Sequence, residues 1–400
     1  MILKDSLKKI LDSQKNIILN NKNTIKRDFN IKDSSKFAII ITGIRRCGKS
    51  TFLMQKINEL DSYNYLNFED SRLVDFELFD FEKLEELFKE KNKNNSIYFF
   101  DEIQNVNKWE IFIREKINEG KKIFLTGSNS RLLSKELGTR LTGRYLNYEL
   151  FPFSFNEFSK FFKKEKNKTL FLDYLEKGGF PEYLKTNNPQ ILTTLFEDIL
   201  IRDIIVRYKI RDEKILKQLA IYLISNIGKV ISFNSLKKIF EVGSTNTILS
   251  YISFMENTYL FFLVNKFDFS YKKQLIAPKK IYCVDNALVK NIGLSFNEDK
   301  GRLLENLIFL FLRRNYKEIY YYKGNKECDF LIGEKNKITK VIQVCYELNN
   351  DNLEREYTGL LEAMTLLKLK EGLIITLEQE DLIIKENKKI KIIPAWKFLN

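Results

Sequence analysis

The chain has 400 residues, of which 44% are apolar and 14% aromatic, and its 67 Lys and Arg against 53 Asp and Glu give a net charge of +14. This length and composition indicate about two or three globular domains. The absence of histidine excludes His-dependent catalysis and His-ligated zinc. Apolar runs stop well short of the ~18 residues that span a bilayer, and the N-terminus lacks a signal-peptide pattern. We therefore expect a cytoplasmic protein with no membrane partner and with its four cysteines as free thiols.

Residues 1–36 are basic and have helical spacing, and residues 37–60 follow as a buried strand, a glycine-rich loop and a helix. The loop has the phosphate-binding pattern of a glycine, four residues and then Gly-Lys-Ser. Its backbone N–H groups and the helix N-terminus attract phosphate, while Lys49 can reach the β and γ phosphates and Ser50 can ligate Mg²⁺. The predicted ATP-binding residues are Gly43, Ile44, Arg45, Arg46, Cys47, Gly48, Lys49, Ser50 and Thr51.

The segment "SIYFFDEIQ", which begins at Ser96, predicts a second buried parallel strand that ends in two carboxylates. Asp101 is the candidate ligand of Mg²⁺, and Glu102 is the candidate catalytic group that orients and deprotonates the attacking water. The alternative is an acidic, solvated turn, which is common after a strand. The preceding phosphate loop favours the catalytic interpretation, because phosphoryl transfer requires a metal-organising acid nearby.

The next predicted strand, "KKIFLTGSNS", ends in small polar residues. Because ligands bind outside the carboxyl ends of strands in an open parallel sheet, these residues should meet the loop and the acid pair in one crevice. Either Ser128 or Asn129 can sense the γ-phosphate. The alternative role for both is to cap the following predicted helix, "SRLLSKEL".

Several motifs along the chain resemble those of one family. They are the phosphate loop with its Arg-Arg insert, "FFDEIQ", "TGSNS", "LTGR" followed by "LFPFSFNEF", and "GGFPEYL". The chain resembles the prokaryotic extended AAA-type ATPases that carry a winged-helix segment and a restriction-endonuclease-like tail. The resemblance implies a homo-oligomer, such as a hexamer, in which an arginine reaches the neighbouring subunit's γ-phosphate. The matching positions are Arg140 and Arg144, and their alternative role is an ordinary surface ion pair.

Residues 161–210 read as a helical connector, and residues 211–270 have the helix, turn, helix and strand order of a winged helix. Its second helix, at about residues 244–257, is the one expected to enter a major groove. That helix contains no Lys or Arg, so direct duplex readout is not favoured. DNA contact and a protein-docking or spacer role both remain open for this module.

Residues 271–400 contain an amphipathic helix with Glu305, strand-like residues around Asp329 and the segment "KVIQVCYEL". This order resembles the restriction-endonuclease-like core. The last pair of that core, a metal-binding carboxylate and a lysine, is replaced by Gln343 and Cys345. We therefore predict a retained fold with a degenerate nuclease-like site. An alternative role for Glu305 is an ion pair with Arg302 or Arg313. Glu347, expected further along the strand that contains Gln343 and Cys345, is a candidate replacement ligand.

The predicted fold class is α/β: a P-loop NTPase core with a parallel sheet at residues 37–160, then the helical and winged-helix segments, then the restriction-endonuclease-like tail. The predicted function is Mg²⁺-dependent ATP binding and hydrolysis that rearranges DNA-associated C-terminal modules. The net charge favours DNA as a partner, bound weakly and with little sequence preference. The alternatives are a nucleotide-gated protein-binding switch without nucleic acid and an ATP-regulated nuclease.

Overall fold

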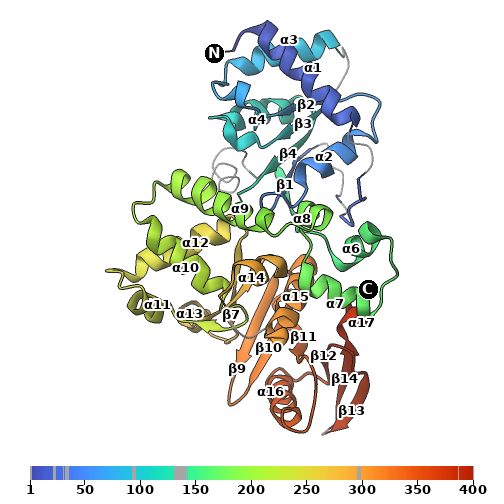
Figure 1. Ribbon diagram of the computed structural model, residues 1–400, viewed down its shortest axis with the longest axis vertical. Helices are drawn as coiled ribbons and strands as arrows, with labels where there is room; N and C mark the ends of the chain where they lie inside the picture. Colours follow the sequence, from blue (N-terminus) through green and yellow to red (C-terminus); the bar gives the residue numbers. More distant parts are fainter. Residues whose placement is uncertain are drawn as a thin grey trace. The chain divides into compact units, whose positions relative to one another are not determined.

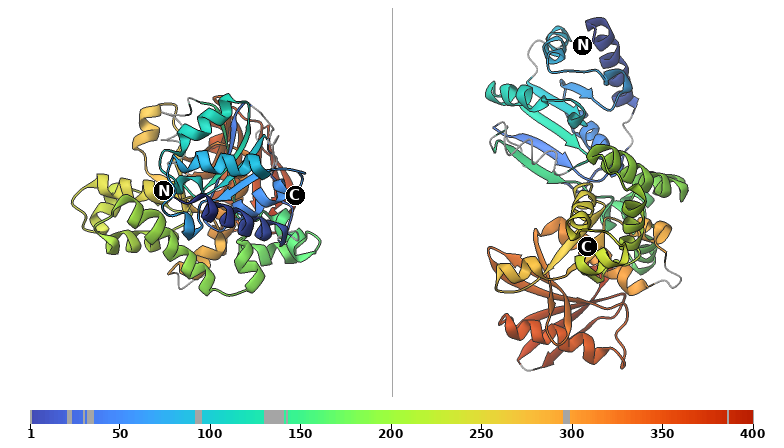
Figure 2. Two further views of the ribbon diagram at one scale, coloured as in Figure 1. Left: turned by 90° about the horizontal axis from the view of Figure 1, so that it is seen from above. Right: turned by 90° about the vertical axis from the view of Figure 1, so that its left-hand side faces the viewer.

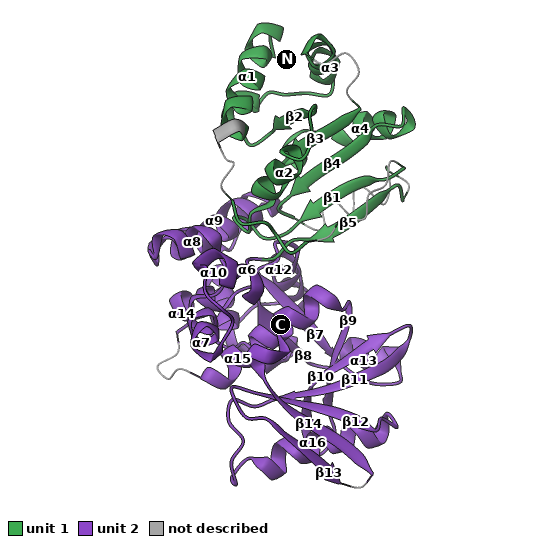
Figure 3. Cartoon of the chain, turned by 90° about the vertical axis from the view of Figure 1, so that its right-hand side faces the viewer, with its two compact units in different colours: residues 1–151 green, residues 152–400 purple. Residues whose placement is uncertain are grey.

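A computed structural model describes residues 2–20, 24–29, 31, 36–91, 96–129, 141, 143–294, 299–385 and 387–399. The chain divides into two compact units, unit 1 from Met1 to Phe151 and unit 2 from Pro152 to Asn400 (Figure 3). Each unit has its own sheet, with five strands in unit 1 and nine in unit 2 among the described residues. No helix in these ranges is both long enough and apolar enough to cross a bilayer.

The five strands of unit 1 are all parallel (Figure 1). Their spatial order is β2 (Asn64–Asn67), β3 (Ile97–Asp101), β4 (Lys122–Gly127), β1 (Ala38–Thr42) and β5 (Tyr145–Glu149). The helices of this unit are α1 (Lys4–Asn20), α2 (Lys49–Ile57), α3 (Asp80–Lys91) and α4 (Trp109–Asn118), with 3₁₀ turns at Ser71–Leu73 and Ile103–Asn105. The strands β1, β3 and β4 and the helix α2 confirm the predicted strand-loop-helix core.

The central strands β1, β3 and β4 are buried on both faces, which explains why they are largely apolar runs. On one face, alternate residues such as Ile40 and Phe100 form one apolar core with side chains of α1, α3 and α4. On the other face, Phe99 and Phe124 stack with their ring centroids 4.7 Å apart. Figure 2 shows the strands of unit 1 side by side, with helices next to them. The sheet is therefore a rigid support for the loops at its carboxyl edge.

Unit 2 begins with helices and then alternates helices and strands (Figures 1 and 3). Its helices are α6 (Phe155–Phe162), α7 (Lys168–Lys177), α8 (Pro181–Thr186), α9 (Gln190–Asp198), a π-helix (Ile199–Val206), α10 (Glu213–Ile224), α11 (Phe233–Ile239), α12 (Thr245–Asn257), α13 (Tyr271–Ile276), α14 (Asn286–Ile292), α15 (Lys300–Asn315), α16 (Leu353–Leu366) and α17 (Ala395–Phe398). Its strands in spatial order are β13 (Asp381–Lys385), β14 (Lys388–Pro394), β12 (Glu371–Thr376), β11 (Lys337–Val344), β10 (Glu327–Glu334), β9 (Glu318–Lys323), β7 (Phe261–Lys266), β8 (Lys279–Cys283) and β6 (Val230–Ile231).

One sheet crosses the boundary that the sequence predicts at residues 270 and 271. Strand β7 lies before this boundary and pairs antiparallel with β8, which lies after it. The same β7 pairs in parallel with β9, more than 50 residues further along the chain. The expected winged-helix module and the expected tail therefore share a continuous hydrogen-bonded sheet, a relationship that local sequence patterns do not contain.

The motifs "LFPF" and "GGFPEYL" meet where unit 2 begins. The backbone N–H of Phe153 donates to the carbonyl oxygen of Gly179 at 2.7 Å. A Cβ atom at Gly179 would lie 2.3 Å from the carbonyl oxygen of Phe153, so only glycine fits there. The carboxylate of Asp285 accepts from the N–H of Gly179 at 2.7 Å. These motifs therefore have a structural role in joining α6, α7 and α14.

Candidate functional site

The phosphate loop connects β1 to α2 and is shaped by its two glycines. Gly48 caps α2 with φ of 100° and has no side chain that could bond to the first N–H groups of the helix. A Cβ atom at Gly43 would lie 2.1 Å from the carbonyl oxygen of Leu150, so the close approach of the chain after β5 requires glycine. Arg46 adopts a left-handed conformation with φ of 62°. Such a turn directs successive N–H groups to one side and suits a phosphate.

Lys49, the first residue of α2, lies over this loop. Its Nζ donates to the carbonyl oxygens of Gly43 and Ile44 at 3.1 and 3.2 Å. The same ammonium lies 3.5 Å from a carboxylate oxygen of Glu102, and both side chains are largely buried. The fold thus brings together the candidate phosphate-binding lysine and the candidate water-activating acid, which are 53 positions apart in the sequence.

Asp101 ends β3 and is fully buried. Its carboxylate accepts hydrogen bonds from the hydroxyls of Ser50 and Thr126, and the Thr126 hydroxyl also accepts from the N–H of Glu102 at 2.9 Å. Thr126 is therefore a link between the two acids and β4. Nothing in the local sequence pattern indicates these partners of Thr126.

The two neighbouring carboxyl groups have pKa values shifted in opposite directions. Burial, with a further contribution from the charge of Glu102, raises the pKa of Asp101 to about 6. Burial alone would also raise the pKa of Glu102, but the charges of Lys49 and Arg45 and the hydrogen bonds from Gln104 and Lys49 together outweigh it and lower that pKa. Environments that separate the pKa values of adjacent acids are typical of catalytic sites, where the two groups have different tasks.

The residues present fit a magnesium ion held jointly with a nucleotide. The hydroxyl of Ser50 and the carboxylate of Asp101 already contact each other, and both are oxygen ligands of the kind that Mg²⁺ prefers. Among the described residues, no group of three or more His, Cys, Asp or Glu side chains could hold a metal ion unaided. The ion would therefore need phosphate oxygens and water to complete its shell, as is usual for magnesium in such sites.

Of the remaining predicted residues of this site, some are described by the structure and others are not. Ser128 and Asn129 follow β4 at the carboxyl edge of the sheet and are buried, with exposed fractions of 3% and 1%. Their position is compatible with sensing a phosphate and does not distinguish between them. The helix that they were alternatively expected to cap, and Arg140, lie outside the described residues.

Arg144 lies at the amino ends of the strands, whereas the phosphate loop lies at their carboxyl ends. It precedes β5, whose first residue, Tyr145, is level with the start of β1 at Ala38. The loop follows the far end of β1 at Thr42, about 13 Å along the strand. The guanidinium of Arg144 donates to the Oδ1 of Asn118 at 2.6 Å. Arg144 therefore does not belong to the phosphate site of its own chain.

Arg27 is a residue of this site that the sequence analysis missed. Its guanidinium is 7% exposed and donates to the carbonyl oxygen of Cys47 at 2.8 Å and to that of Phe151 at 2.6 Å. It therefore joins the phosphate loop to the segment after β5. Its surroundings in the sequence are those of a basic leader, and only the fold identifies its partners.

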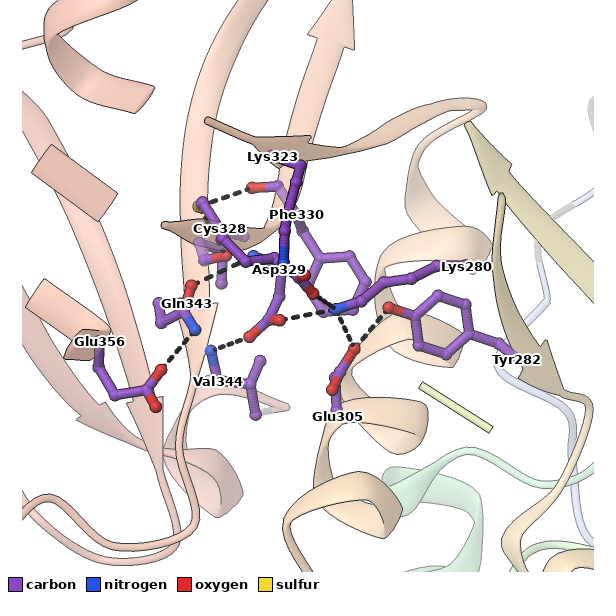
Figure 4. Close-up of polar contacts among 12 residues, drawn as sticks. Lys280, Tyr282, Glu305, Lys323, Cys328, Asp329, Phe330, Gln343, Val344 and Glu356 are labelled. Atoms are coloured by element: carbon purple, nitrogen blue, oxygen red, sulfur yellow. Dashed lines mark hydrogen bonds and ion pairs between the residues drawn. The ribbon is translucent and has the colours of Figure 1, made fainter. Parts of the chain in front are cut away.

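A second polar cluster lies in unit 2 and contains two residues of the predicted degenerate nuclease-like site (Figure 4). Glu305 of α15 and Asp329 of β10 both contact the ammonium of Lys280, each at 2.8 Å. Glu327 forms a third ion pair with this ammonium, also at 2.8 Å. The partner of Glu305 is thus Lys280 and not Arg302 or Arg313. Lys280 belongs to β8, and no sequence motif indicated it.

Charge and burial oppose each other in this cluster. Burial alone would lower the pKa of Lys280, but the surrounding groups, led by Asp329 and Glu305, together outweigh it and hold that pKa well above its usual value. Burial raises the pKa of Glu305 to about 7, although the charge of Lys280 acts in the other direction. The ammonium is therefore firmly charged, whereas the carboxyl group of Glu305 takes up a proton near neutral pH.

The other two residues of the predicted nuclease-like site have structural partners. The Oε1 of Gln343 accepts from the N–H of Asp329 at 3.2 Å, and its Nε2 donates to Glu356 at 2.5 Å (Figure 4). Cys345 donates to the carbonyl oxygen of Glu347 at 3.2 Å, and burial raises its pKa to about 11. Strand β11 ends at Val344, so Glu347 does not continue that strand as expected.

Comparisons with known proteins agree with the geometry of unit 1. Residues 35–159 match the family described as "AAA domain", and residues 168–299 match a family described as "Domain of unknown function (DUF8612)". Together with the phosphate loop and its acid pair, this match defines the class: the chain contains an AAA-type P-loop ATPase domain, which supports nucleotide binding and hydrolysis.

The chain belongs to the same family as Uncharacterized protein MJ1544 of Methanocaldococcus jannaschii, which is 40% identical over 94% of this chain and 90% of that protein. An uncharacterized protein of Haemophilus influenzae is 30% identical over 85% of this chain and 90% of its own length. Among solved structures, the chain is similar to the Walker-type ATPase PABY2304 of Pyrococcus abyssi, with 14% identity, coverage of 68% of this chain and 98% of that one, and a TM-score of 0.42.

Proposed function

We propose that the protein is a Mg²⁺-dependent ATPase that uses hydrolysis to rearrange DNA-associated modules in unit 2. The observation that carries the enzymatic part is the convergence of Lys49, Asp101 and Glu102 at the carboxyl edge of one parallel sheet. The experiment that tests it is the release of phosphate from ATP by the purified chain, with magnesium and with EDTA. Turnover that requires magnesium is expected, and equal turnover in EDTA would contradict the proposal.

Each residue of the site has a distinct task in this proposal. The loop N–H groups and Lys49 bind the phosphates, and Ser50 and Asp101 hold the magnesium ion, which neutralises charge on the β and γ phosphates. Glu102 orients the attacking water and accepts its proton, since its lowered pKa keeps it ionised. Thr126 holds Asp101 and the backbone of Glu102 in position.

The proposed DNA contact is the segment between β7 and β8. The order α10, β6, α11, α12, β7, β8, with antiparallel β6–β8 and β7–β8 pairs, matches that of a winged helix, and this segment takes the place of the wing. It includes α13, which buries none of its side chains. Phe269 and Tyr271 are 76% and 70% exposed, and Lys272 and Lys273 are also exposed.

This combination of side chains favours contact with the nucleic-acid backbone over reading of the sequence. Lysines neutralise phosphates, and exposed aromatic rings can stack on any base. Helix α12, the expected recognition helix, contains no Lys or Arg. Weak, salt-sensitive binding with little sequence preference is therefore expected, and it would depend on the wing more than on α12.

The test is a titration of duplex and single-stranded DNA at ~50 and ~200 mM salt, with and without ATP. Replacing Lys272 and Lys273 together by Ala should weaken binding and reduce the salt slope by about 2. The matched control replaces Lys368 and Lys370, two exposed lysines elsewhere in unit 2. Equal losses in both double variants would contradict the assignment of the wing. Salt-insensitive binding, or none at low salt, would favour the alternative of a nucleotide-gated protein-binding switch.

The proposal includes assembly into a homo-oligomer. Arg144 lies at the sheet edge opposite the loop of its own subunit, where it could act only on the nucleotide of a neighbouring subunit. Arg140, the other candidate, lies outside the described residues. A neighbouring arginine would stabilise the charge that develops on the transferred phosphoryl group.

A further inference from the structure

The ammonium of Lys280 has one carboxylate partner within the chain for each of its three N–H groups. It has three N–H donors and three carboxylate partners, Glu305, Glu327 and Asp329, each at 2.8 Å. Its side chain is 2% exposed, and it comes from β8, whereas its partners come from α15 and β10. A single cation thus lies at the point where three acidic side chains from two other elements converge. Figure 4 shows two of these acids, Glu305 and Asp329, on either side of the ammonium.

Each carboxylate is also held in place by a group other than this lysine. The hydroxyl of Tyr282 donates to Glu305 at 2.6 Å, and the N–H of Val344 donates to Asp329 at 2.9 Å. Lys323 donates to Glu327 at 3.1 Å. The orientation of the acids toward their common centre therefore does not depend on Lys280 alone, and removing the amine should leave the three groups still facing one another.

The three carboxylates outnumber the positive charge at their centre even when Lys280 is present. Three carboxylates face one buried ammonium, and the other nearby lysine, Lys323, is 53% exposed. Buried carboxylates without a counter-charge are strongly unfavourable, so the cluster must keep a cation or take up protons. Oxygen ligands gathered around one point are also what Ca²⁺, Mg²⁺ and Mn²⁺ require, at distances shorter than those to an ammonium.

We propose that Lys280 is the permanent cation of this cluster and occupies the place that a divalent metal ion would otherwise take. With the ammonium in place the three acids form no metal site, in agreement with the absence of any such group among the described residues. The cluster therefore binds no metal in the native protein, holds β8, α15 and β10 together, and has no hydrolytic activity on nucleic acids. Removing the Lys280 side chain beyond its Cβ atom should convert the cluster into a divalent-cation site that uses Glu305, Glu327 and Asp329.

The test measures Mn²⁺ binding by electron paramagnetic resonance and thermal unfolding in Mn²⁺ or EDTA, with the full chain and without nucleotide. The variants are Lys280→Ala, which makes room for an ion, and Lys280→Met, which keeps the apolar stem and removes only the charge. Both retain the nucleotide site, so any difference from wild type reports on the cluster. Lys280→Ala with Asp329→Asn is the matched control, because it removes the amine together with one ligand.

We expect Lys280→Ala to bind one Mn²⁺ more than wild type and to unfold at a lower temperature in EDTA. Saturating Mn²⁺ should raise its unfolding temperature by about 5 °C or more, and the double variant should lose both effects. Lys280→Met should be destabilised in the same way and respond less to Mn²⁺, since its stem fills the site. A folded Lys280→Ala protein that binds no additional Mn²⁺ would overturn the proposal.

Mn²⁺ binding by the wild-type protein provides a second, independent test of the proposal. If Lys280 closes the site, wild type and Asp329→Asn bind the same amount of Mn²⁺, and wild type does not cut supercoiled plasmid in Mg²⁺ or Mn²⁺. Mn²⁺ that binds to wild type and is lost in Asp329→Asn would show that metal and lysine coexist in the cluster, and the proposal would be wrong. This comparison decides the matter even if neither variant of Lys280 folds.

Discussion

The ammonium of Lys49 lies 3.5 Å from the carboxylate of Glu102. This pair joins the residue proposed to bind phosphate to the residue proposed to activate water. Because the first task concerns binding and the second only the chemical step, substitutions at the two positions should have different consequences.

Lys49→Ala should abolish tight ATP binding, whereas Glu102→Gln should preserve binding and slow turnover by about 10² or more. Binding of a fluorescent ATP analogue and steady-state phosphate release measure the two effects separately. Glu86→Gln, an exposed substitution of the same kind on α3, is the control. Wild-type turnover in Glu102→Gln would eliminate Glu102 as the catalytic base.

Arg27→Ala should reduce both the stability of unit 1 and the affinity for ATP. The substitution leaves the carbonyl oxygens of Cys47 and Phe151 without their charged donor, at a cost of about 2 kcal/mol in the free energy of unfolding. Urea unfolding and ATP titration are the measurements. Lys26→Ala, which removes the neighbouring exposed charge, should change neither. Unchanged ATP affinity in Arg27→Ala would show that the loop keeps its shape without this contact.

Arg144→Ala should slow hydrolysis by up to about 10³ if this arginine acts on a neighbouring subunit. Mixing Arg144→Ala subunits with Lys49→Ala subunits should restore part of the activity, because each variant supplies what the other lacks. The measurement is phosphate release across a series of mixing ratios. Co-assembled mixtures that stay inactive would contradict action between subunits.

Glu256→Gln should stabilise the protein more at pH 8 than at pH 5. Burial raises the pKa of Glu256 from 4.5 to about 7, so between these values the folded chain holds a proton that the unfolded chain releases. Wild-type stability therefore falls as the pH rises through this window. Glutamine cannot ionise, and the variant should gain about 1–3 kcal/mol relative to wild type at pH 8. Urea unfolding at both pH values tests this.

The exposed substitution Glu241→Gln is the control for this prediction, and its effect should be small and independent of pH. A Glu256→Gln difference of equal size at pH 5 and pH 8 would mean that the carboxyl group is already ionised in the folded chain at both values.

The parts of the fold that the sequence predicted are those encoded by short continuous patterns. The strand, loop and helix around Lys49 and the strand that ends in Asp101 need only local residue order. Arg27 and Lys280 could not be predicted because their partners are distant in the sequence and are selected by strand order. Lys280 reaches Asp329 only because β8 joins the sheet that contains β10, and no spacing rule encodes that arrangement.

The continuous sheet of unit 2 determines where this chain can be divided for expression. A fragment that ends at residue 270 would separate β7 from β8 and β9. Both halves would then present unpaired strand edges, which promote aggregation. Division between residues 151 and 152 separates no paired strands among the described residues, since neither sheet contains strands from both units. Soluble fragments are therefore expected only from the second cut.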